Sequence, residues 1–504
     1  MPEKKMVNIN DMPKWFRAIM ILAPIAGLLL ITTQLDNDFY FIYKTGEYIV
    51  HHGFPTTDFL SMHSTMSIIP QQWLTGVVFY YLYSLLGRWG VIGFIYLCYA
   101  LVCVIIHKLV MMICDNLFIA NIISFCSDLL LAVMFEKTRP QAITYVIIIT
   151  ELYLLERFVQ KKKIIYLCFI PLLSVLQINF HCSMWIMLFV FALPFAAAAI
   201  PVKIGKIRQE PCCSFLKLLI CGVITFAAGF LNPYGIKAIT YITTSFGYSE
   251  IDSSIVEMQK TSLADASGII LFALLAIIAV VALAIKKKNY SARYVLLFSG
   301  TTLMALLNIK SIAYFLIGGL PAFSYMLKDV EILLPVDEKK KRNTKEKRKL
   351  IVLIVLFVAM VGVLGGTLMH QSANEDSIKN QNEAEYAALD EIITILDKEN
   401  MDDIVLFAGF NQGQYLEFHG YHPYIDGRAE LFLKDNNGEY DYLKEYRELN
   451  SGKIYYKDFV NKYQFNYLVV DTIQTHFISS LKHDSDYELL YKSDHAYLFH
   501  LKEK

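Results

Sequence analysis

Charge is scarce in this sequence. Only 18% of the 504 residues are Asp, Glu, Lys or Arg, and the 46 basic residues balance the 46 acidic ones. A soluble protein of this length carries about a quarter charged residues, so the composition points away from a soluble protein. The zero net charge argues against nucleic acid as a partner, because a nucleic-acid surface needs an excess of positive charge.

Cysteine is confined to one part of the chain. All nine cysteines lie between Cys98 and Cys221, scattered through apolar segments, and none has the spacing of a metal-binding motif. The polar region after residue 370 has no cysteine, so no disulfide bond holds it together. No internal repeat is evident.

Apolar residues, in contrast, make up 55% of the chain, and the mean hydropathy is +0.42. Apolar runs of roughly 18 or more residues recur between Trp15 and His370, each long enough to cross a bilayer. The first run has no small-residue cleavage site and is followed by many more, so we expect a retained helix. Residues 1–369 are therefore predicted to form a polytopic α-helical membrane domain with about 11 transmembrane helices, at 17–34, 89–110, 117–135, 140–158, 163–180, 183–202, 214–231, 266–285, 292–308, 311–328 and 350–369.

Clusters of lysine and arginine predict the orientation of these helices. They lie near the N-terminus, at His107-Lys108, and at 161–163, 203–208, 286–288 and 337–349. With a cytoplasmic N-terminus, alternating helices place all of these clusters inside, as the positive-inside rule requires. The count holds only if 70–87 is a juxtamembrane helix in the interface, and a marginal membrane span is the competing interpretation. We therefore expect a multi-pass protein of the cell (plasma or inner) membrane whose C-terminus lies outside.

The chain changes character after the last apolar run. A polar linker over 370–385 leads to a region of about 120 residues, 386–504, which is large enough for its own core. Its pattern predicts a small extracytoplasmic α/β domain with helices at 386–399 and 474–481, strands at 403–407 and 467–471, and a terminal hairpin over 487–501.

The stretch 35–73, which opens an outer loop over 35–88, is dense in titratable side chains. They are Asp36, Asp38, Lys44, Glu47, His51, His52, Asp58 and His63. Polar groups are costly to keep inside a bilayer and easily kept at its surface. In the same topology, further polar residues fall on outer turns: Arg139, Asn179, His181, Asn232 and Lys310. We therefore expect an active site at the outer surface of the membrane.

A series of short motifs follows this order along nearly the whole chain. They are Asp36-Asn37-Asp38, Gly46, Pro55-x-x-Asp58-x-x-Ser61, Gln72-Trp73-Leu74, Arg139-Pro140-Gln141, Asn179-Phe180-His181, Asn232-Pro233-Tyr234-Gly235 and Asp426-Gly427-Arg428. Their order resembles the GT-C glycosyltransferases, integral membrane enzymes that use polyprenyl-phosphate sugars as donors, and within them a largely uncharacterised bacterial branch. Two positions depart from that branch, because Ile42 stands in place of the usual histidine and Gln72 in place of the usual glutamate.

The resemblance implies transfer of a sugar from a polyprenyl-phosphate donor to a glycan, lipid or protein acceptor on the extracytoplasmic side. Such a reaction needs a base for the acceptor hydroxyl and cations for the departing phosphate. We expect Asp38 to be the base and Asp36 to orient it; a divalent metal, if one is bound, is expected at Asp36 and Asp38. The residues expected to bind the donor phosphate or the substrate are Arg139, Lys310, Arg428, His181, His51, Asn232 and Asp58.

Two other functions remain open from the sequence. Asp128 and Glu151 fall within predicted membrane helices, and buried acids there are typical of proton or ion paths. The alternative is therefore a lipid-linked glycan transporter, flippase or polymerase, although Gly-interrupted helices in matching halves are absent. The departures at Ile42 and Gln72 also leave open a catalytically inactive membrane scaffold. Arg139 fits a simple interfacial anchor as well.

Overall fold

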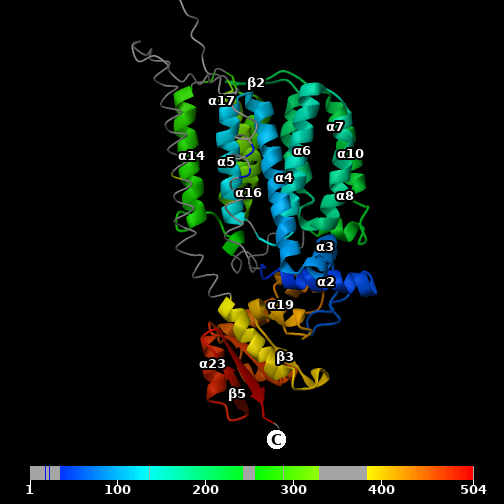
Figure 1. Ribbon diagram of the computed structural model, residues 1–504, viewed down its shortest axis with the longest axis vertical. Helices are drawn as coiled ribbons and strands as arrows, with labels where there is room; N and C mark the ends of the chain where they lie inside the picture. Colours follow the sequence, from blue (N-terminus) through cyan, green and yellow to red (C-terminus); the bar gives the residue numbers. More distant parts are fainter. Residues whose placement is uncertain are drawn as a thin grey trace, which may run out of the picture.

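The computed structural model describes residues 35–135, 137–241, 256–285, 287, 289–328 and 383–502, together with the single positions 18, 22 and 362. Figure 1 shows an upright bundle of helices with a small domain packed against one end of it. Apart from those single positions, the predicted helices 17–34 and 350–369 lie outside the described residues, as does most of the predicted linker 370–385.

The bundle helices run along the long axis of the molecule (Figure 1). They are α4 (Arg88–Cys114), α5 (Leu117–Phe135), α6 (Gln141–Lys161), α7 (Ile165–Cys168), α8 (Ile170–Phe180), α9 (Met187–Ala196), α10 (Phe215–Ala228), α14 (Ala266–Ile285), α15 (Ala292–Leu307), α16 (Ile312–Tyr314) and α17 (Leu320–Leu327). Each apolar segment that the sequence predicts between 89 and 328 is thus helical over most of its length.

Among the described residues, four helices are long and apolar enough to cross a membrane: α4, the run Cys182–Ala199, α14 and the run Ile309–Leu327. Shorter apolar helices pack around them, including α5, α8, α10 and α15. The predicted membrane character is therefore supported by these helices. The full number of about 11 spans, the kind of membrane and the orientation stay predictions.

Two predicted helices are interrupted, and a proline lies at each interruption. The segment 163–180 divides into α7 and α8, with Pro171 in the first turn of α8. The segment 311–328 passes through the π-helix η6 (Phe315–Gly319) before Pro321 in the first turn of α17. A proline lacks the N–H group and its ring clashes with the carbonyl four residues earlier, which disfavours a regular α-helix at both of these positions.

Residues 39–52 form a helix inside the predicted outer loop over 35–88, for which no helix was predicted in this part. α2 (Phe39–His52) buries Phe39, Ile42 and Ile49, whose spacing is that of one helix face. Gly53, with a φ of 86°, ends the helix in a backbone conformation that favours glycine. The titratable residues of this stretch therefore lie on a helix that is fixed by its apolar face.

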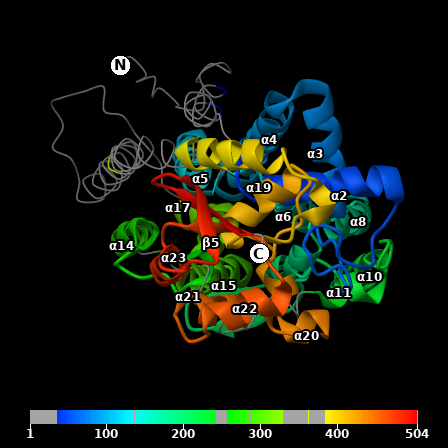
Figure 2. The ribbon, with the colours of Figure 1, turned by 90° about the horizontal axis from the view of Figure 1, so that it is seen from below.

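α2 and α3 (Trp73–Leu86) both lie across the end of the bundle instead of along it (Figures 1 and 2). The transverse direction of α3 is the one expected of a juxtamembrane helix over 70–87. The two helices cross closely at Gly46 and Gly76, because a Cβ on Gly46 would lie 2.0 Å from the carbonyl oxygen of Gly76.

The C-terminal domain is a four-stranded sheet with helices on both faces. Its strands lie in the order β3 (Leu406–Phe407), β4 (Tyr467–Asp471), β6 (Ala496–Leu501) and β5 (Tyr487–Lys492), with β3 parallel to β4 and the other pairs antiparallel. Side chains alternate along β4, so Tyr467 and Val469 join the core under the helix 383–396, and Leu468 and Val470 join the core on the other face. The predicted α/β domain is present, with a first strand shorter than the predicted 403–407.

The rest of this domain consists of short helices and turns. They are α19 (Phe410–Phe418), η8 (Ala429–Phe432), α20 (Lys434–Asn437), α21 (Tyr442–Asn450), α22 (Tyr456–Tyr463) and α23 (Thr475–Lys482). α19 packs on α2, where the ring of Tyr40 meets the ring of Tyr415 edge to face at 4.9 Å between centroids.

The segment between α2 and α3 is bonded to the domain as well. Met62 N–H donates to the carbonyl of Pro423 at 3.0 Å, and His63 Nε2 lies 2.9 Å from the carbonyl oxygen of Tyr424. The two regions are therefore packed as one body at the end of the bundle.

This packing predicts that cysteines introduced at Ser64 and Ser479, both exposed, lie on the same side of the membrane. In a background without the native cysteines, a membrane-impermeant maleimide should label both variants in intact cells. The matched control is Lys206→Cys, between β1 (Val202–Ile204) and β2 (Ile207–Gln209), which lie at the far end of the bundle (Figure 1) and should be protected until the cells are permeabilised. Labelling at Ser64 with protection at Ser479 would contradict the packing, and labelling at Lys206 would contradict the predicted orientation.

Candidate functional site

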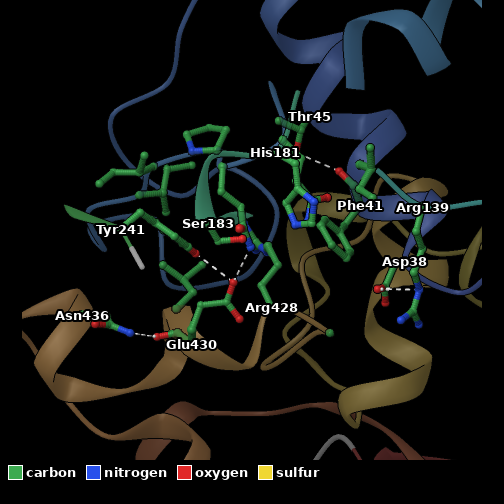
Figure 3. Close-up of a pocket in the computed structure, with 18 of the residues that line it drawn as sticks. Asp38, Phe41, Thr45, Arg139, His181, Ser183, Tyr241, Arg428, Glu430 and Asn436 are labelled. Carbon is green, nitrogen blue, oxygen red and sulfur yellow. Dashed lines mark hydrogen bonds and ion pairs between the residues drawn. The ribbon is translucent and has the colours of Figure 1, made fainter. Parts of the chain in front are cut away.

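A cavity of about 470 Å³ lies where the end of the bundle, α2 and the C-terminal domain meet. Five of the residues predicted for the site line it: Asp38, Arg139, His181, Lys310 and Arg428. Figure 3 shows Asp38 and Arg139 at one side of the cavity, Glu430 and Tyr241 at the other, and His181 between them. The cavity thus has two polar ends that different parts of the chain supply.

Arg139 lies among three carboxylates at the first end. Its Nε is 2.6 Å from Asp36 Oδ1 and 3.0 Å from Asp38 Oδ2, and its Nη1 is 3.3 Å from Glu257 Oε2. Lys137 Nζ lies 2.5 Å from the other oxygen of Glu257. These side chains are half-buried, so solvent and salt screen their charges less than at an open surface.

Three separate turns bring these groups together. Asp36 and Asp38 directly precede α2, and the backbone N–H of Asp36 donates to Thr138 Oγ1 at 2.6 Å. Arg139 follows in the turn between α5 and α6, just before Pro140, and Glu257 lies in η4 (Val256–Met258). The turn between two bundle helices thereby anchors the start of α2.

Asp38 is the carboxyl group of this cluster that is suited to accept a proton. Burial raises its pKa from 3.8 to about 6, Arg139 opposes the increase, and the negative charge of Asp36 adds to it. The pKa of Glu257 moves the other way: burial would raise it, but Lys137 and Arg139 hold it down at about 2. The cluster therefore combines a permanent anion with a group that titrates near neutral pH.

Lys310 brings another positive charge to the cavity. It belongs to η5 (Ile309–Ser311), which opens the apolar run Ile309–Leu327. Within the described part of the chain, no carboxylate forms an ion pair with its ammonium group and no acceptor takes a hydrogen bond from it. Arg139, in contrast, is paired with carboxylates. The charge of Lys310 is therefore available to an anionic ligand.

His181 lines the cavity as a neutral imidazole. Its Nδ1 is 3.0 Å from Thr144 Oγ1, and Gln177 Nε2 donates to Thr144 Oγ1 at 3.1 Å and to the His181 carbonyl at 2.9 Å. Burial, together with the positive charge of Lys310, lowers its pKa to about 3. A neutral imidazole can form a hydrogen bond to a ligand but adds no charge for a phosphate.

Glu430 forms the second polar end of the cavity. Its Oε1 accepts hydrogen bonds from Gln71 Nε2 and from the hydroxyl of Tyr241, each at 2.8 Å. The backbone around it is fixed, because Asn436 Nδ2 donates to the Glu430 carbonyl at 2.6 Å (Figure 3). The C-terminal domain thus contributes a carboxylate directly to the cavity.

Arg428 is engaged in a buried ion pair between the two parts of the molecule. Its two Nη atoms lie 2.7 and 3.1 Å from the carboxylate oxygens of Asp58, and its Nε and Nη2 lie 2.9 and 2.6 Å from Asp426. Glu417 is 3.8 Å away, and burial together with the charge of Asp426 raises its pKa well above the usual range. The guanidinium fork is therefore already matched by protein carboxylates, although the sequence analysis expects it at the donor phosphate.

The other predicted site residues do not line the cavity. Asp36 lies behind Asp38 and holds Arg139. His51 Nε2 is 3.0 Å from the hydroxyl of Tyr80. Asn232 Nδ2 donates to the carbonyls of Gly229 and Gly235, which fixes a turn. Asp58 forms an ion pair with Arg428, and the positive charge of Arg428 holds the pKa of Asp58 below its usual value despite burial.

Four residues that line the cavity are not among the predicted site residues: Glu257, Glu430, Gln71 and Tyr241. Glu430 stands two residues after the motif Asp426-Gly427-Arg428, and Gln71 directly precedes the Gln72-Trp73-Leu74 motif, so proximity to a motif was the available signal. Glu257 belongs to the long predicted outer loop that follows Asn232-Pro233-Tyr234-Gly235, where its charge was the available signal, and nothing in the sequence marks Tyr241.

The fit of a divalent metal can be judged from the carboxylates themselves. Among the residues that the structure describes, no group of three or more His, Cys, Asp or Glu is placed to hold a metal ion. Asp36 and Asp38 come together around the guanidinium of Arg139, which occupies the position that a cation would need. A metal would have to displace Arg139, so the two aspartates do not fit a metal site in this arrangement.

Comparison with known proteins gives no assignment: no protein-family model matches the chain, and no curated protein shows significant similarity to it.

The burial of Arg428 predicts a structural loss when it is replaced. Removing one partner of a buried ion pair costs about 3–5 kcal/mol, because the remaining charges stay unpaired. Arg428→Met should therefore lower the unfolding midpoint of the full-length protein and speed its cleavage by trypsin between the bundle and the C-terminal domain. Lys444→Met, on the exposed side of α21, is the matched control and should change neither. Equal stability of the two variants would contradict the role of Arg428 as the link between the two parts.

Proposed function

We propose that this protein is an integral membrane glycosyltransferase that transfers a sugar from a polyprenyl-phosphate donor to an acceptor hydroxyl. The observation that carries the proposal is one cavity that holds Asp38, whose pKa is raised to about 6, beside Arg139 and an unpaired Lys310. A base that titrates near neutral pH and a free cation are the two groups that transfer from a lipid phosphate requires. The order of motifs along the sequence supports the same reaction class.

In the proposed reaction, the carboxylate of Asp38 takes the proton of the acceptor hydroxyl. The acceptor oxygen forms a bond to the anomeric carbon of the donor sugar while the bond from that carbon to the phosphate oxygen breaks. The leaving polyprenyl phosphate gains negative charge, which Lys310 and Arg139 stabilise. Asp36 and Glu257 fix the Arg139 guanidinium, so that it is already oriented before the substrate binds.

The position of the cavity suits a lipid-linked substrate. The cavity is lined by Phe41, Ile42 and Thr45 of α2, the helix that lies across the end of the apolar bundle (Figure 1). A polyprenyl chain can stay in the hydrocarbon region beside the bundle while its phosphate reaches the polar end of the cavity. The acceptor enters from the side of the C-terminal domain, which we place outside the membrane on the basis of the lysine and arginine clusters.

A transporter remains the second candidate because of buried acids in the bundle. Asp128 and Glu151 each expose only 1% of their surface. Asp128 faces the Cys103 thiol, and Glu151 Oε2 has no hydrogen-bond partner among the described residues. Neither acid lines the cavity, so they support a separate ion path in the bundle and not the proposed transfer reaction.

The proposed base predicts the effect of Asp38→Asn. General base catalysis contributes about 10²–10⁴-fold, so turnover in a purified transfer assay should fall by this factor while the protein stays folded. Since the pKa of Asp38 is raised to about 6, wild-type kcat/KM should fall as the pH drops through 6, where the carboxylate becomes protonated. Asp402→Asn, on the exposed surface of the domain, is the matched control. Near-parental transfer by Asp38→Asn, with loss of function in Asp128→Asn, would favour the transporter.

The unpaired ammonium group predicts the effect of Lys310→Met on binding of polyprenyl phosphate. A hydrogen bond to a charged group contributes about 1.5–3 kcal/mol, so the affinity should fall about 10-fold or more. Lys310→Arg keeps the charge and should retain most of the affinity. Lys237→Met, exposed on α11 (Ile236–Thr240), serves as the control for general loss of positive charge. Equal affinity of the Lys310→Met variant and the wild type, measured with the protein in nanodiscs, would contradict the phosphate site.

A further inference from the structure

We infer that Gln71, Gln72 and Glu430 form a subsite for the hydroxyl groups of a sugar, with Gln71 and Glu430 at the end of the cavity opposite Asp38 and Arg139. Nothing in the sequence motifs assigns this role to them. The inference rests on the proposed function only for the identity of the sugar, which belongs either to the acceptor or to the donor.

The first observation is an excess of hydrogen-bond acceptors without donors. Among the described residues, the Oε1 atoms of Gln71, Gln72 and Gln141 are buried and have no hydrogen-bond partner. All three residues line the cavity. A buried acceptor without a hydrogen bond is costly, so these oxygens favour a ligand that brings its own donors.

The orientation of the Gln71 amide is fixed by chemistry. Its partner is the carboxylate of Glu430, which accepts a hydrogen bond and cannot donate one while ionised. The nitrogen of the amide must therefore face Glu430, and its oxygen is the atom left without a partner. The acceptor character of this end of the cavity thus does not depend on how the amide is assigned.

Glu430 adds a further acceptor. Both of its side-chain hydrogen bonds end on Oε1, from Gln71 and Tyr241, and the described residues place no cation within ion-pair distance of the carboxylate. Its Oε2 is left for a ligand. A carboxylate and neighbouring amide oxygens together match the adjacent hydroxyl donors of a sugar, whereas they repel a phosphate. The ion-pair cluster around Arg139 thus lies at one end of the cavity, and the acceptors of Gln71 and Glu430 lie at the other (Figure 3).

Two regions that lie far apart in the sequence supply the residues of this subsite. Gln71 belongs to the segment before α3, and Glu430 to η8 of the C-terminal domain. The subsite exists only while the domain is docked, so the domain acts as a specificity element of the cavity.

The test measures binding of methyl glucoside, methyl galactoside, methyl mannoside and methyl N-acetylglucosaminide to the full-length protein in nanodiscs, by saturation-transfer NMR. We expect at least one to bind the wild type, and its affinity to fall about 10-fold or more in Glu430→Gln and in Gln71→Ala, which each remove an acceptor. Glu391→Gln, exposed on the helix 383–396, is the matched control. Unfolding midpoints of all variants show whether they are folded.

Each outcome has a defined meaning. Binding of none of the four glycosides, or equal binding by the wild type and the folded Glu430→Gln and Gln71→Ala variants, overturns the subsite. If glycosides bind through Glu430 but the wild type binds no polyprenyl phosphate, the proposed donor is wrong and the sugar subsite stands. In the transfer assay, an increased KM for the acceptor in Glu430→Gln assigns the subsite to the acceptor, and an increased KM for the donor assigns it to the donor sugar.

Discussion

The ion pair of Arg428 with Asp58 and Asp426 connects the two parts of the molecule, and the cavity depends on it. Asp58 lies between the two transverse helices, and Arg428 follows 370 residues later in the C-terminal domain. Both carboxylates are fully buried, so separating the domain from this segment would leave charges unpaired in a medium of low polarity. The cavity wall on one side is the continuation of the Asp58 segment, and on the other the turn that follows Arg428. A firmly docked domain is therefore a condition for the site.

Arg139 also forms ion pairs with aspartates, but one of these aspartates is more exposed. Its carboxylate partner Asp38 exposes 29% of its side chain, whereas the Asp58 side chain exposes 0%. Because the carboxylates of Asp58 and Asp426 are fully buried, their ion pair with Arg428 stabilises the docked domain. Arg139, in contrast, holds a carboxylate that still opens into the cavity, so its partner can exchange a proton with a ligand. The two ion pairs therefore differ in the accessibility of the carboxylate. Asp58 is closed off beside Arg428, whereas Asp38 beside Arg139 can reach a ligand.

Much of the fold follows from local patterns in the sequence. Apolar runs long enough to cross a bilayer predicted the bundle helices, and short runs of β-branched and aromatic residues predicted β4 and the terminal hairpin. α2 was missed because its titratable residues obscured the apolar spacing of its buried face. The motifs placed Asp38 at the cavity, but the pairing of Asp58 with Arg428 joins positions so distant that one sequence alone cannot reveal it. Glu430 was not predicted for a similar reason. Its role depends on Gln71 and Tyr241, which lie far from it in the sequence and contact it only in the folded protein.

A structure of the full-length protein in nanodiscs with bound polyprenyl phosphate tests the central claim most directly. The claim is that the cations at one end of the cavity receive the lipid phosphate within reach of Asp38. We expect the phosphate density within hydrogen-bond distance of Lys310 Nζ, facing Arg139, with the polyprenyl chain leaving the cavity along the apolar bundle. A phosphate bound away from this cavity, for example beside Asp128 in the bundle, would contradict the account.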